Sequence, residues 1–162
     1  MSPVQTEDPE RTRLIQERDL FRQLLALGER EELEPFIAEA LALIAKVSRA
    51  RRAYIELADE REGARDQVFS QVHGCTPDET GNFRAGISNG IIAKAIATRS
   101  TINSVSALDD ARFRERASVR LNQIQAVLCA PVLSGTYAGV IYLQDREVPG
   151  PFTEEDRLRA ES

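Results

Sequence analysis

The hydrophobic pattern is most informative between residues 125 and 145, where two short apolar runs flank a polar break. Ala126–Leu133 and Val140–Leu143 are apolar at consecutive rather than alternate positions, which predicts strands buried on both faces. The break, Ser134–Thr136, consists of turn residues, so the simplest connection is an antiparallel hairpin. A hairpin covered on both sides belongs at the centre of a sheet with helices above and below.

Helical periodicity dominates the first 48 residues. A first helix is predicted to begin at Pro9, with Asp8 as its N-cap, and to end at Gly28. Its apolar stripe comprises Leu14, Leu20, Phe21, Leu24, Leu25 and Leu27. A second helix is predicted over Glu31–Ser48. Its buried face comprises Leu33, Phe36, Ile37, Ala40, Leu43, Ile44 and Val47.

The remaining elements are shorter. Strands are predicted at Ala53–Leu57, Gln67–His73 and Thr101–Val105, and a third helix from Ser88 to about Thr98. Irregular connections are expected over Gly74–Gly86 and Ser106–Asn122, the second with a short helix near Asp110–Arg116. A last helix is expected to start at Phe152–Asp156, where Thr153 and Asp156 have capping-box spacing.

This order of elements predicts an α+β fold, with a central antiparallel sheet of about five to six strands and helices on both faces. Residues 1–30 are expected to form an N-terminal amphipathic helix for linkage or dimerisation, and residues 31–162 the globular domain. The last predicted helix has barely two turns before Ser162, which suggests a domain excised from a longer protein.

Composition narrows the class of protein. The chain has 162 residues, 42% of them hydrophobic and 29% charged, as expected of one ordinary globular domain. Its formal net charge of −5 argues against direct contact with nucleic acid or an anionic membrane. The longest apolar run is far short of a membrane span, and the polar N-terminus lacks a signal-peptide pattern. We therefore expect a cytoplasmic location.

Cysteine and histidine are scarce, which limits the possible site chemistry. Cys75, Cys129 and His73 are too few for a structural zinc site, which needs about four such ligands. His73 and Cys75 would share a face if both lay on one strand, but no third group is available to orient a catalytic pair. The simpler interpretation is a strand end followed by a loop.

The chain resembles GAF domains, the small-molecule-sensing regulatory modules, from about Leu33 to Leu158. The order and spacing of several segments carry the resemblance, although none is specific alone. These segments are Arg52–Leu57, Gly90–Thr98, Thr101–Val105, Asp109–Phe113, Ser118–Arg120, Val127–Val132, Gly139–Leu143 and Phe152–Asp156.

Within the family, Ser118–Pro131 looks like the GAF domains that precede the AAA+ ATPase of bacterial sigma-54-dependent activators. Related segments also occur in the GAF domains of cyclases and sensor kinases. This chain has no glycine-rich ATP-binding loop with its lysine, so any motor or catalyst that it controls lies outside these residues.

The resemblance implies a ligand pocket over the sheet, roofed by Gly86–Thr98 and Asn103–Gln123 and floored by Ala126–Cys129 and Val140–Tyr142. The candidate ligand-binding residues are Asn103, Asp109, Asp110, Arg114, Arg120, Cys129 and Tyr142. Arginines of the roof, Arg112 and Arg116 included, suit an anionic ligand. The competing interpretation is that they are solvated and partly paired with neighbouring carboxylates.

The sequence names no cofactor. The cyclic-nucleotide signature of the family is not found, and the roof has neither the cysteine nor the histidine that bilin attachment requires. Neither His73 nor Cys129 is a compelling haem ligand. Asp109, Asp110 and Cys129 could together hold non-haem iron, although a cysteine within an apolar strand is usually a small core residue.

Three functions remain. The first is a non-enzymatic sensor that binds an unidentified small-molecule effector and signals to an output domain in the same polypeptide. The second is a ligand-free dimerisation or docking scaffold of a sensor kinase or cyclase. The third is a free methionine-(R)-sulfoxide reductase, which would need a resolving cysteine partner. We also expect a homodimer through the terminal helices, whose amphipathic faces would pair in a parallel bundle.

Overall fold

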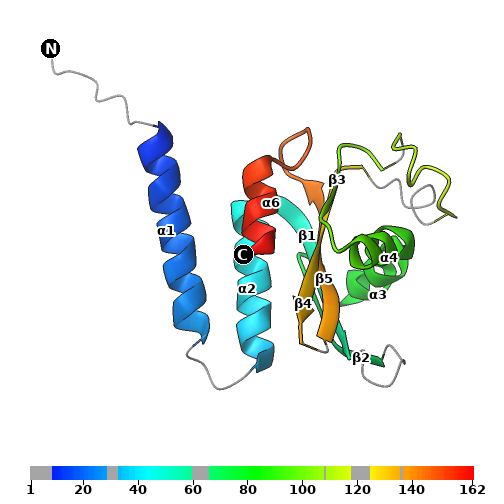
Figure 1. Cartoon of the computed structure of the whole chain (residues 1–162), viewed down its shortest axis with the longest axis horizontal. Coiled ribbons are helices and arrows are strands. Elements are labelled where there is room, and N and C mark those ends of the chain that lie inside the picture. Colours follow the sequence, from blue (N-terminus) through cyan, green and yellow to red (C-terminus); the bar gives the residue numbers. More distant parts are fainter. Residues whose placement is uncertain (1–8, 29–32, 60–65, 108, 118–124, 136) are drawn as a thin grey trace, which may run out of the picture. The chain divides into compact units, whose positions relative to one another are not determined.

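The computed structural model describes residues 9–28, 33–59, 66–107, 109–117, 125–135 and 137–162 (Figure 1). The chain divides into two compact units, Met1–Ala40 and Leu41–Ser162, with the boundary inside the second helix.

The first unit holds helix α1, Pro9–Gly28, and the beginning of α2, Leu33–Val47. Both predicted ends of α1 are confirmed, whereas the expected N-cap, Asp8, lies outside the described residues. Leu20 is buried, but Leu14 is 54% exposed. The side chains at positions 21, 24, 25 and 27 of the predicted stripe are likewise outside the described set.

The second unit is built on one five-stranded antiparallel sheet. Its strands are β1 (Ala50–Asp59), β2 (Asp66–His73), β3 (Ile102–Ser104), β4 (Val127–Ser134) and β5 (Tyr137–Arg146), in the order β2-β1-β5-β4-β3. The predicted hairpin is confirmed, and its second strand is the central strand of the sheet. The α+β prediction is therefore confirmed.

Helices cover the two faces of this sheet (Figure 1). Helices α3 (Pro77–Gly86) and α4 (Asn89–Thr98) lie on one side; α6 (Glu154–Glu161) and the end of α2, from Leu41 on, lie on the other. We call the buried cluster under α4 the α4-side core. It comprises Tyr54, Phe83, Ile87, Ile91, Ile92, Ala95, Ile102, Ala107, Phe113, Val127, Cys129, Val140 and Tyr142.

Helix α3 occupies most of a segment expected to be irregular. The prediction failed because the segment is polar and shows no apolar stripe; Phe83 is its one buried residue. Its start is nevertheless encoded, since Pro77 occupies the first turn and Thr76 and Glu79 form a capping box.

The expected short helix near residue 110 is a set of turns over residues 111–115. The Asp110 carboxylate accepts a hydrogen bond of 3.0 Å from the Arg112 backbone N–H. Such local side-chain bonds stabilise turns at the expense of a regular helix.

Candidate functional site

The floor of the candidate site is a pair of residues on the hairpin. Cys129 of β4 and Tyr142 of β5 are register partners, and both point into the α4-side core. Neither has exposed surface. Burial, with a smaller contribution from the charge of Glu56, raises the pKa of the Cys129 thiol, which keeps that thiol protonated at neutral pH.

The start of α4 lies directly over this pair. Ser88, the buried N-cap of α4, accepts a hydrogen bond from the Ile91 backbone N–H at 3.4 Å. Helix α4 contacts β5, the strand that carries Tyr142. Burial raises the pKa of the Tyr142 hydroxyl, which therefore remains neutral. The start of α4 is thus packed against the central strand.

Polar side chains form two pairs on the same face of the neighbouring strands β1 and β5. The Tyr54 hydroxyl donates to Glu56 Oε2 at 2.9 Å, and the Tyr142 hydroxyl donates to Gln144 Oε1 at 3.2 Å. Tyr54 lies opposite Tyr142 in the sheet. Sequence analysis missed Glu56, Gln144 and Ser88 as site residues; the register of β1 and β5 brings the two pairs together.

The connection after β3 is held to the sheet by Asp110. This carboxylate accepts 2.8 Å and 2.7 Å hydrogen bonds from Ser104 Oγ and Arg112 Nη2, and these contacts hold its pKa far below the ordinary value. Asp109 is exposed, and Arg114 lies 3.7 Å from Glu115 at the surface. Arg112 and Arg114 are thus near carboxylates, as the solvated interpretation of the roof arginines expects.

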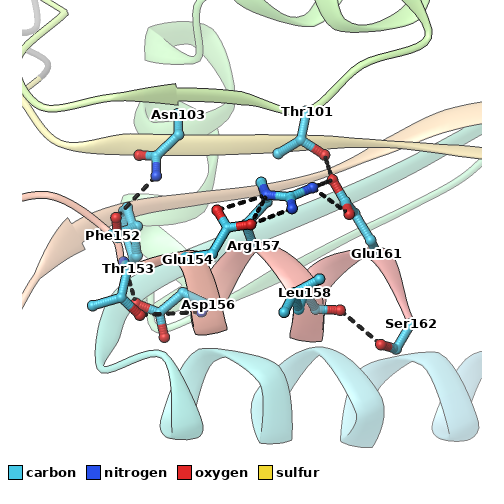
Figure 2. A network of polar contacts seen from close by, with 10 residues as sticks. All are labelled: Thr101, Asn103, Phe152, Thr153, Glu154, Asp156, Arg157, Leu158, Glu161 and Ser162. Atoms are coloured by element: carbon cyan, nitrogen blue, oxygen red, sulfur yellow. Dashed lines mark hydrogen bonds and ion pairs between the residues drawn. The ribbon is translucent and has the colours of Figure 1, made fainter.

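Asn103 lies on the opposite face of the sheet from Cys129 and Tyr142. Its Nδ2 donates to the Phe152 carbonyl at 2.9 Å, toward α6 (Figure 2). In the same network, Arg157 Nη1 binds Glu161 at 2.7 Å, and Glu161 accepts from Thr101 Oγ1 at 2.5 Å. The structure therefore brings Cys129 and Tyr142 together and separates Asn103 from them.

Other candidates fall elsewhere. Arg120 lies outside the described residues. The simpler interpretation of His73 and Cys75 is confirmed, because β2 ends at His73 and Gly74, with φ of +82°, turns the chain before Cys75. Cys75 packs against the α4-side core instead, whereas His73 pairs with Ala53.

Within the described ranges, no three His, Cys, Asp or Glu side chains are grouped closely enough to hold a metal ion, the Asp109, Asp110 and Cys129 set included. Among the described helices, none combines the length and hydrophobicity needed to cross a membrane.

Solved structures resemble this fold at low sequence identity. The GAF domain of a phosphoenolpyruvate-protein phosphotransferase from Coxiella burnetii has a TM-score of 0.64 and 16% identity, covering 90% of this chain and 86% of that one. Free methionine-R-sulfoxide reductase from Neisseria meningitidis, solved with its substrate, has a TM-score of 0.60 and 17% identity, with coverage of 88% and 79%.

A mutated NreA protein from Staphylococcus aureus, changed in its nitrate-binding site, has a TM-score of 0.56 and 19% identity, with coverage of 78% and 99%. No curated protein sequence matches this chain. The sequence profile of the GAF domain matches residues 32–161, which is most of the chain. With the matching architecture of sheet and helices, this shows that the chain belongs to the GAF domain family.

Proposed function

We propose that this chain is a non-enzymatic sensor that binds a small molecule on the α4 side of its sheet and signals to an output domain. The single observation that carries the proposal is the polar row of Tyr54, Glu56, Tyr142 and Gln144 within a largely apolar setting under α4. Small-molecule sites commonly combine apolar walls with a few such polar groups, which fix the orientation of the ligand.

The sheet offers a route from that site to a terminal helix. Strand β4 contacts α4 and also contacts α6. A ligand that displaces the start of α4 would therefore act on the strand that supports α6. Signalling requires that the ligand bind one arrangement of these helices more tightly than the other.

We further propose that the output domain is the AAA+ ATPase of a sigma-54-dependent activator. The support is the resemblance of Ser118–Pro131 to the GAF domains that precede such ATPases. This part of the proposal is tested separately, by asking whether the ATPase activity of the whole polypeptide responds to the effector.

The alternative, a ligand-free scaffold, is favoured by one observation. Cys129 and Tyr142, the expected pocket floor, have no exposed surface in the described structure. A site already filled by side chains would leave dimerisation or docking as the principal role.

Native mass spectrometry of the purified chain, followed by a thermal-shift screen of metabolites and metal ions, separates these functions. A sensor should retain or bind one compound and show an increase in Tm that scales with its concentration. Glu56→Gln should reduce that increase, whereas Glu115→Gln, whose side chain is 81% exposed at the surface, should not. A complete screen without a binder favours the scaffold.

The non-enzymatic part of the proposal has its own test, an assay for reductase activity. The reductase from Neisseria meningitidis shares the fold at 17% identity, and Cys75 packs against the cluster that contains Cys129. The assay measures thiol-dependent reduction of free methionine sulfoxide by this chain. If the chain has this activity, and both Cys75→Ser and Cys129→Ser abolish it, an enzymatic function replaces the sensor proposal.

A further inference from the structure

A pocket lined by residues outside the α4-side core lies at one end of the sheet, with Arg52 in its wall next to Phe83 of that core. Its volume is about 310 Å³, and its walls come from the start of β1, the end of β5, the segment before β4 and the loop that follows β5. None of its lining residues belongs to the α4-side core. The volume is at the lower end of the range for small-molecule sites.

Positive charge predominates in this pocket. Arg51, Arg52 and Arg146 line it, with Asp145 as the single carboxylate in the lining. Asp145 Oδ2 lies 3.6 Å from Arg52 Nε, so the carboxylate compensates for one guanidinium. Arg51 and Arg146 have no ion-pair partner among the described residues. This concentration of positive charge is found in a chain whose net charge is −5.

Two of the three arginines are held in place by other contacts. Arg146 Nη1 donates to the Pro151 carbonyl at 2.8 Å, which fixes the guanidinium against the loop. The guanidinium of Arg52 lies 5.6 Å from the centre of the Phe83 ring. Preorganised donors lose less conformational entropy when a ligand binds.

The pairing of Arg146 is also incomplete. Its Nε is buried without an acceptor among the described residues, although buried polar groups in proteins almost always have one. A guanidinium has five N–H donors in a planar fork, which matches the paired oxygens of a carboxylate or phosphate.

We infer that this arginine pocket, formed by Arg51, Arg52 and Arg146, binds the carboxylate or phosphate group of a small anionic metabolite. The inference goes beyond the proposed function, because the pocket shares no residue with the site under α4. Binding here can therefore fail while the sensor proposal stands, and the reverse also holds.

The experiment titrates the full chain with inorganic phosphate and, separately, with succinate, against sodium chloride at matched ionic strength. Backbone amide NMR signals report the position of binding. We expect saturable shifts at Arg51, Val105 and Gly150 with at least one of the two anions. Binding of phosphate but not succinate would indicate a phosphorylated ligand, and binding of succinate but not phosphate would indicate an organic acid.

Arg51→Gln is the decisive variant, because the Arg51 side chain is exposed and makes no hydrogen bond or ion pair with another described residue, so its replacement should not disturb the fold. This substitution should lower the affinity for the anion about tenfold, which is the effect of losing one charge-assisted contact. The matched control is Arg84→Gln, an exposed arginine on α3 outside the pocket, which should leave the affinity unchanged.

Three results would overturn the inference. One is the absence of saturable shifts for both anions up to about 20 mM, beyond which affinity is negligible. Another is saturable binding that maps outside the pocket. The third is equal weakening by Arg51→Gln and Arg84→Gln, which would show a general effect of net charge.

Discussion

At Gly139 in β5, a side chain would clash with the backbone of the neighbouring strand β1. A Cβ atom there would lie 1.9 Å from the Glu56 carbonyl oxygen of β1. We expect Gly139→Ala to lower the free energy of unfolding by roughly 2 kcal/mol or more, because neither backbone can move without loss of ladder hydrogen bonds. Urea denaturation measures the difference.

Gly81 in α3 is the matched control for that measurement. No atom lies within 4 Å of a Cβ built there, and the position is inside a helix. Gly81→Ala should therefore stabilise the protein by about 0.5–1 kcal/mol. Equal effects of the two substitutions would contradict the close approach of β1 and β5.

The two cysteines should differ sharply in reactivity. Cys129 is fully buried, whereas Cys75 is partly accessible. Burial raises the pKa of Cys75, so its reaction with a thiol reagent should accelerate as the pH rises from 7 to 9. In an Ellman assay, the native chain should react with one equivalent of reagent through Cys75, and the Cys129 thiol should react only when the chain is unfolded in urea. Rapid loss of both thiols in native protein would contradict the burial of Cys129.

Asp110 should make stability depend on acidity. Its pKa is lowered in the folded state, chiefly by hydrogen bonds from Arg112, below the ordinary value of 3.8. The stabilisation is therefore complete above about pH 4–5 and is lost as the pH falls through the folded-state pKa. Asp110→Asn should lower the free energy of unfolding by about 1–2 kcal/mol at pH 7, because the substitution removes the charge-assisted hydrogen bonds.

Unfolding measured between pH 7 and pH 2 tests this dependence. The difference between wild type and Asp110→Asn should shrink below pH 4. Asp109→Asn, at an exposed neighbour, should stay within about 0.5 kcal/mol of wild type at every pH. A constant difference for Asp110→Asn would rule out an ionic contribution.

At the scale of elements, the start of α6 depends on a reciprocal cap. Thr153 Oγ1 accepts from the Asp156 N–H at 3.2 Å, and the Thr153 N–H donates to Asp156 Oδ2 at 2.8 Å. Thr153→Ala should cost about 1 kcal/mol in urea denaturation. Thr153→Ser keeps the hydroxyl and should restore most of the loss; failure to do so would assign the effect to the methyl group.

Elements were predictable where burial determined them. The apolar runs of the central hairpin require cover on both faces, so the fold class and the hairpin itself could be predicted from the sequence. The pairing of Cys129 with Tyr142 comes from the register of the two strands, which the sequence does not specify. Helix α3 was missed because its sequence contributes little to the core. The side of Asn103 could not be predicted, since the face of a three-residue strand is decided by its register with β4.

At the scale of the whole molecule, we predict a homodimer through the terminal helices. Leu14 and Ile15 of α1 are 54% and 40% exposed, and Leu158 of α6 is 52% exposed. Sedimentation equilibrium at tens of micromolar protein should give the mass of two chains. Leu14→Asp should shift the equilibrium toward the monomer, because it places a charge on apolar surface that the dimer would bury. Lys94→Asp, at an exposed position on α4, is the control. A monomer in the unaltered chain would refute the prediction.

The strand order has a consequence for the synthesis of the protein. The central strand β5 is the last strand in the chain, and its pairing with β1 joins Ala50 to Arg146. Until β5 has left the ribosome, the β1–β2 hairpin and the β3–β4 pair have no strand between them and both present open edges. Such edges invite pairing with other chains, and contacts so distant in sequence form slowly. A nascent chain arrested before β5 is therefore the form of this protein most exposed to aggregation and most in need of a chaperone.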